Sequence, residues 1–122
     1  MPARVRITAN FQGNLDSIRD FLVAAAAPTE FERLLDRLFD EIIPNLARFT
    51  DLGRDFAARM PQSAEGAAAL AALRRKAGPD TTLREYITGD YLLLYAVRAG
   101  TVFLLSIRHH RQLSFDLRGH WR

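Results

Sequence analysis

The chain of 122 residues contains no cysteine. This absence excludes a disulfide framework, a thiolate metal site and a thiol nucleophile. Long apolar runs are also absent, since none approaches the ~18 residues that a membrane-spanning helix requires. The first segment carries charges every few residues and lacks the apolar stretch of a secretory signal. These absences predict a cytoplasmic protein that does not act in a membrane.

Lysine is nearly absent as well, because sixteen of the seventeen basic residues are arginine. Residues 1–82 contain eleven basic and eleven acidic side chains, whereas residues 83–122 contain six basic and three acidic ones. All three histidines lie in this last third of the chain. A positive surface attracts a polyanion or an acidic protein partner, and a solvated basic edge without a partner is the alternative.

The length suits one hydrophobic core and is too short for two well-packed domains. We therefore expect a single domain over residues 1–122. A helical insertion is predicted at about residues 57–80, where an alanine-rich segment follows Ser63 and ends before Gly78.

The first part of the chain predicts a strand followed by a helix. Residues 4–9 alternate polar and apolar side chains, which is the pattern of a half-buried strand. Asn14 then precedes apolar residues at helical spacing, so we expect it to cap a helix that runs into the alanines at 24–27. Pro28 either ends this helix or starts the next element.

A second amphipathic helix is predicted from Thr29, which forms a capping-box pattern with Glu32. Its apolar stripe consists of Phe31, Leu34, Leu35, Leu38, Phe39, Ile42 and Ile43. The opposite face carries Asp36, Arg37, Asp40 and Glu41, which we interpret as a solvated surface and not as an acid and base pair. Pro44 is expected to bend or break the helix, because it lacks an amide donor.

Three strands are predicted in the second half, over residues 83–87, 91–98 and 101–109. Short turns at Gly89-Asp90 and Ala99-Gly100 separate them, so they form an antiparallel meander. The chain is therefore predicted to be an α/β (α+β) fold, in which a helical hairpin covers one face of a small sheet. The two long strands are apolar on both faces, which leaves the second face for a partner or for a concave binding surface.

The last strand ends in the basic, imidazole-rich cluster Arg108, His109, His110 and Arg111. Neighbouring residues on a strand point to opposite faces, so His109 and His110 cannot both face one substrate. The same geometry argues against a dihistidine metal site. No metal and no cofactor are expected.

The order of these segments resembles the RelE/ParE superfamily of toxins from type II toxin-antitoxin modules. The resemblance is carried by VRITANFQGNLDSIRDFL, DLGRDF, LREYITGDYLLLYAV and VFLLSIRHHRQLSF, and it spans most of the chain outside residues 57–80. It implies a small α/β toxin that a cognate antitoxin neutralises by wrapping over its surface. Such gene pairs maintain a plasmid or respond to stress.

We expect a toxin that arrests growth by ribosome-dependent mRNA cleavage, with inhibition of DNA gyrase as the alternative, because the resemblance leaves the cellular target open. RelE-like toxins cleave mRNA on the ribosome, and ParE-like toxins inhibit DNA gyrase without being nucleases. RelE-like members carry an arginine where Leu92 stands and often a tyrosine where Phe115 stands, so two expected catalytic groups are missing.

Under the nuclease hypothesis, a histidine transfers protons and the arginines bind phosphate. This hypothesis assigns catalysis to His109, His110 and Arg111, and substrate binding to Arg108, Tyr91 and Arg84. The protein would then be a metal-independent, RNA-binding endoribonuclease that acts on ribosome-bound mRNA. The alternatives are a non-enzymatic inhibitor of gyrase and an inactive domain that only sequesters an antitoxin.

Overall fold

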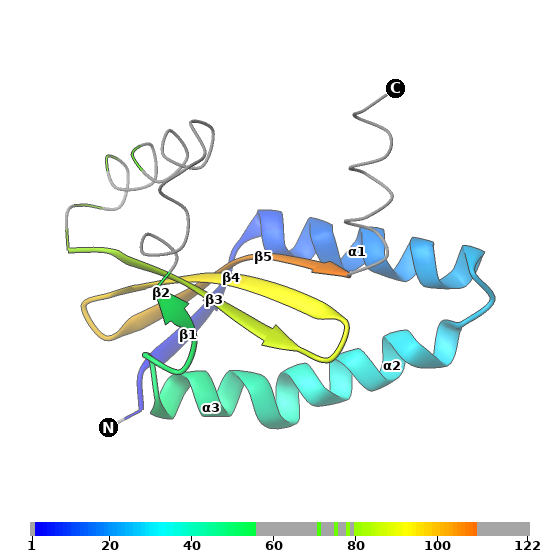
Figure 1. Cartoon of the computed structure of the whole chain (residues 1–122), viewed down its shortest axis with the longest axis horizontal. Coiled ribbons are helices and arrows are strands. Elements are labelled where there is room, and N and C mark those ends of the chain that lie inside the picture. The colour runs from blue at the N-terminus through cyan, green and yellow to red at the C-terminus, as the bar shows by residue number, and fades with distance from the viewer. Residues whose placement is uncertain (1, 56–70, 72–74, 76–77, 79, 110–122) are drawn as a thin grey trace.

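One mixed sheet organises the described part of the chain, with its strands in the order β1-β5-β4-β3-β2 (Figure 1). The computed structural model describes residues 2–55, 71, 75, 78 and 80–109. The strands are β1 (Arg4–Ile7), β2 (Arg54–Asp55), β3 (Thr82–Thr88), β4 (Tyr91–Arg98) and β5 (Thr101–His109). β1 runs parallel to β5, and the other neighbours are antiparallel. The predicted α+β fold and its meander are confirmed, and β1 and β2 extend the meander at its two edges.

The helices form the predicted hairpin, which Figure 1 shows as two antiparallel arms joined at one end. The first arm is α1 (Ala9–Ala24). The second consists of α2 (Pro28–Arg37), a π-helical turn η1 (Leu38–Ile42) and α3 (Ile43–Arg48). Within the described ranges, no helix is long and apolar enough to span a membrane.

α1 begins earlier in the chain than the sequence predicted. Its N-cap is Thr8, whose hydroxyl accepts the Phe11 N–H at 3.2 Å and donates to the Leu104 carbonyl at 2.7 Å. Asn14 lies inside the helix, and its Oδ1 accepts the Ile107 N–H at 3.1 Å. The prediction of Asn14 as the cap was wrong because this residue lies inside α1, where its side chain binds the backbone of β5.

The polar side chains at the start of α1 continue the pairing of β5 beyond the end of β1. Leu105 has no register partner on β4, since Leu94 pairs with Ser106 and Tyr95 with Leu104. The Asn10 amide donates to the Leu105 carbonyl at 2.8 Å. This β-bulge is therefore satisfied by a helix side chain, as buried or half-buried backbone groups require.

The second arm also starts and continues differently from the prediction. Pro28 is the first residue of α2, and Ala27 caps it without a side-chain hydrogen bond, so the capping box at Thr29 is not formed. Proline suits this position because its fixed φ is helical and its missing N–H would have no partner there.

Pro44 does not break the second arm. The Ile43 N–H bonds to the Leu38 carbonyl five residues back, which is the π-helical register. This shift places Pro44 in the first turn of α3, where the helix needs no amide donor. The arm therefore continues to Arg48.

The core lies between the hairpin and one face of the sheet. Alternate residues of β4, namely Tyr91, Leu93 and Tyr95, point toward the helices. They pack against a helical set of Phe11, Leu15, Ile18, Leu22, Leu34, Leu38, Ile42 and Leu46. The period-2 and helical patterns in the sequence thus meet on a single apolar layer.

A buried tyrosine fixes the loop that follows α3. The Tyr95 side chain is 0% exposed, and its hydroxyl accepts the Gly53 N–H at 2.8 Å and donates to the Thr50 carbonyl at 2.9 Å. A Cβ on Gly53 would lie 2.5 Å from the Glu85 carbonyl oxygen and 2.8 Å from the Tyr95 ring. Only glycine therefore fits where this loop crosses the sheet.

The substitution Gly53→Ala is expected to lower the free energy of unfolding by about 1–3 kcal/mol, because the added methyl group overpacks a rigid contact. Gly13→Ala is the matched control, since a methyl group added at Gly13 in α1 would have nothing within 4 Å. This control should raise stability by about 0.5–1 kcal/mol through helix propensity. Urea denaturation measures both values, and equal effects at the two glycines would contradict the packing.

Candidate functional site

The end of β5 sends its basic residues to two different faces of the sheet. Arg108 pairs across β4 with Leu92, and His109 pairs with Tyr91 on the helix-covered face. Arg108 is exposed, whereas His109 is only 2% exposed. The other predicted catalytic residues, His110 and Arg111, lie outside the described residues, as do Phe115 and most of the predicted insertion at 57–80.

His109 is packed between two aromatic rings. Its centroid lies 5.6 Å from that of Phe21 and 4.9 Å from that of Tyr91, and the second contact is nearly perpendicular at 83°. Edge-to-face contacts of this kind add to the stabilisation by burial. The catalytic role of His109 stays a prediction. Its packing favours the interpretation that the imidazole of His109 holds the ring of Tyr91 in place.

Arg84 binds the loop before β2. Its guanidinium donates to the Gly53 carbonyl at 2.6 Å and approaches the Asp51 carbonyl at 3.4 Å. Arg84 pairs with Tyr95 in the middle of β4, whereas Tyr91 lies at the strand's start. The structure therefore separates the three predicted substrate-binding residues, since Arg108 faces the other side of the sheet.

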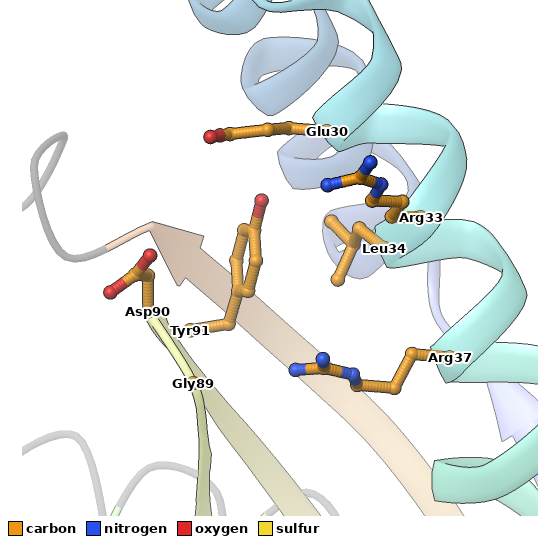
Figure 2. Close-up of a pocket in the computed structure, with 7 residues that line it drawn as sticks. All are labelled: Glu30, Arg33, Leu34, Arg37, Gly89, Asp90 and Tyr91. Carbon is orange, nitrogen blue, oxygen red and sulfur yellow. The ribbon is translucent and has the colours of Figure 1, made fainter.

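Tyr91 borders a cleft of about 270 Å³ between α2 and the β3–β4 turn (Figure 2). The lining residues are Glu30, Arg33, Leu34, Arg37, Gly89, Asp90 and Tyr91. Figure 2 shows the guanidiniums of Arg33 and Arg37 extending from α2 into the cleft, with the carboxylate of Glu30 beyond the hydroxyl end of the tyrosine and that of Asp90 beside its ring. The cleft thus combines four charged groups with a phenol.

This cleft was not predicted from the sequence. The predicted solvated face of Asp36, Arg37, Asp40 and Glu41 is exposed as expected, and Arg37 also lines the cleft together with Glu30 and Arg33, which flank the buried Leu34 at helical spacing. Gly89 makes room for the guanidinium, because a Cβ on this residue would lie 3.0 Å from Arg37 Nη1. Its φ of +54° also favours glycine in the turn. The helical spacing and the turn at Gly89-Asp90 were both visible in the sequence, but the position of this turn opposite α2 was not.

The environment of the cleft raises the pKa of Tyr91 above its usual value. Burial of the phenol is the largest cause, and the negative charges of Glu30 and Asp90 add to it, whereas the Arg37 guanidinium opposes them. The Tyr91 hydroxyl therefore remains protonated at neutral pH and is available as a hydrogen-bond donor. Within the described residues, no group of three histidine or acidic side chains is arranged to hold a metal ion.

The face of the sheet opposite the helices carries a mixed surface. Leu92, Leu94 and Phe103 are half-buried on it, and exposed Arg6 and Arg108 are the register partners of Phe103 and Leu92. We call these five residues the open face. An apolar centre beside guanidiniums is a composition typical of protein interfaces.

Comparisons with protein families and with solved structures identify proteins similar to this chain. The family model described as "ParE toxin of type II toxin-antitoxin system, parDE" matches residues 5–114. A chain of the chromosomal ParDE TA system from P. aeruginosa is 14% identical with a TM-score of 0.56, covering 88% of this chain and 95% of that one. A chain of the RelBE2 toxin-antitoxin complex from Mycobacterium tuberculosis is 20% identical with a TM-score of 0.49, covering 89% and 99%. No curated protein matches the chain.

The charges around Tyr91 predict opposite effects of two neutralising substitutions. Glu30→Gln should lower the pKa of Tyr91 toward its usual value, because it removes a negative charge that disfavours the phenolate. Arg37→Gln should raise this pKa further, because it removes the opposing positive charge. Carbon-13 NMR of the tyrosine Cζ atoms against pH measures both shifts. Shifts of the same sign in both variants would contradict the geometry of the cleft.

Proposed function

The chain belongs to the ParE toxin family of type II toxin-antitoxin systems, and we propose that it arrests growth as a non-enzymatic inhibitor of DNA gyrase. A cognate antitoxin is the proposed partner that neutralises it. The two similar structures support this partner, since one is described as a ParDE system and the other as a RelBE2 toxin-antitoxin complex. The family match carries the toxin assignment, and the gyrase target is the ParE-like alternative within the superfamily.

The surroundings of His109 carry the choice of a binding mechanism. A general base must reach the proton that it abstracts, directly or through one water molecule. The imidazole of His109 is 2% exposed and lies against the rings of Phe21 and Tyr91. This packing supports a role in holding the sheet end together.

The open face is the surface that we propose for gyrase. Arginine and aromatic residues are enriched in the central parts of interfaces, where they contribute most of the binding energy. Phe103 and the leucines supply apolar area there, and Arg108 and Arg6 supply guanidiniums. Protein binding needs no acid and base pair on this surface.

Ribosome-dependent mRNA cleavage is the second candidate. The exposed guanidinium of Arg108 favours it, because an arginine at this position can bind a phosphate of the RNA. Under this candidate, His110 and Arg111 would transfer protons and stabilise the charge that develops on the phosphate.

Two assays with the purified chain separate the candidates. DNA supercoiling by purified gyrase should be inhibited, and primer extension on programmed ribosomes should show intact mRNA. Arg108→Gln should weaken gyrase inhibition about tenfold, as expected for an interface arginine. Arg48→Gln on α3 is the matched control and should leave inhibition unchanged. Cleavage in the ribosomal A site together with normal supercoiling would overturn the gyrase proposal.

A further inference from the structure

Two arginines line the cleft between α2 and the β3–β4 turn. Arg33 and Arg37 are four residues apart on α2 and extend toward the same space (Figure 2). Among the described residues, neither guanidinium forms an ion pair within 4.0 Å, although Glu30 and Asp90 line the same cleft. Both positive charges line this cleft, so an anion bound in it would be attracted by each of them.

The other residues that line the cleft offer apolar surface for the methylene groups of an acidic side chain and a hydrogen-bond donor for its carboxylate. The Tyr91 hydroxyl points into the cleft, where it can donate a hydrogen bond (Figure 2). Leu34 and the Tyr91 ring supply apolar surface. The cleft has a volume of about 270 Å³. Sites for drug-sized ligands typically have volumes of about 300–1,000 Å³, so this cleft suits a smaller group such as one side chain.

We propose that this cleft is a carboxylate-binding site that takes one glutamate or aspartate side chain of a bound peptide. Planar guanidiniums bind a carboxylate through paired N–H donors, and such charge-assisted bonds are among the stronger ones in proteins. The peptide is assigned to the antitoxin, and this assignment rests on the proposed function.

The carboxylates of the cleft favour a peptide over a nucleic acid. Glu30 and Asp90 balance the charges of Arg33 and Arg37, so the cleft as a whole is close to neutral. A nucleic acid carries a charge at every phosphate and binds to surfaces with an excess of positive charge, which this cleft does not have. An acidic side chain brings a single charge on an apolar stem, and the peptide residues next to it can be neutral or basic.

The cleft lies on the helix side of the sheet, because Tyr91 belongs to the helix-facing core. The open face lies on the opposite side and is proposed for gyrase. Antitoxin contact in the cleft therefore involves residues different from those that contact the target.

Binding of a small probe tests the site without the antitoxin. N-acetyl-glutamate N-methylamide is added to the full chain, and NMR follows the Nε–H signals of Arg33 and Arg37. We expect these signals to shift with this probe and not with the neutral glutamine analogue. Inorganic phosphate is tested in the same way. Signals that shift with phosphate but not with the glutamate probe, or that shift with neither of these two anions, would overturn the assignment of a carboxylate site.

Calorimetry with the protein encoded by the adjacent reading frame tests the partner. The double variant Arg33→Gln/Arg37→Gln should raise the Kd for this antitoxin by about tenfold to a hundredfold, as expected for lost charge-assisted bonds. Arg19→Gln/Arg48→Gln removes two exposed positive charges elsewhere on the helices and should change the Kd by less than about threefold.

The outcomes separate the site from the proposed function. Equal Kd values for the two double variants would overturn the cleft as an antitoxin contact. A wild-type chain that binds the glutamate probe but not the antitoxin would support the carboxylate site and overturn its assigned partner. Thermal unfolding of each variant verifies that both remain folded.

Discussion

The central constraint in this structure is the pairing of β5 on both of its edges. β4 occupies one edge, and β1 occupies the other in parallel, which joins the two ends of the described chain. Beyond β1, side chains of Thr8, Asn10 and Asn14 bind the same edge. These bonds fix the start of α1, and the hairpin that α1 begins then places α2 opposite the β3–β4 turn. The cleft is a consequence of this sequence of attachments.

The alternation of β5 also determines how the end of the strand is used. A strand must point successive side chains to opposite faces, so His109 enters the aromatic packing and Arg108 enters the open face. His109 in turn contacts the ring of Tyr91, whose hydroxyl points into the cleft. One strand end therefore supports both proposed binding surfaces, one on each side of the sheet.

Local patterns in the sequence predicted the elements whose signals are themselves local. The Ala99-Gly100 turn is confirmed, with φ values of +48° and +76° that match a tight hairpin. The strand alternation is confirmed. The helical stripe from Phe31 is confirmed as well, except at Phe39, which is exposed, and at Leu35, which is half-buried outside the core cluster. The predictions that were wrong, at Asn14 and Thr29 and in the break at Pro44, concern residues whose role depends on tertiary bonds or on a shifted helical register.

The site was harder to predict than the fold. The sequence indicated that His109 and its neighbours face opposite sides, but it could not show which side the helices cover. The cleft needs α2 and the β3–β4 turn to meet, and these segments are more than fifty residues apart in the chain. Its charged residues have no local pattern that distinguishes them from a solvated helix face.

Growth arrest by a His109→Phe variant tests the account most directly. It asks whether His109, at the end of β5, contributes by packing and not by transferring a proton. Phenylalanine keeps a ring against Phe21 and Tyr91 and removes the group that could transfer a proton. After induced expression without antitoxin, the variant is predicted to arrest growth as strongly as the wild-type chain. A variant that folds normally, by thermal unfolding, and yet no longer arrests growth would contradict this and would place the imidazole of His109 in catalysis.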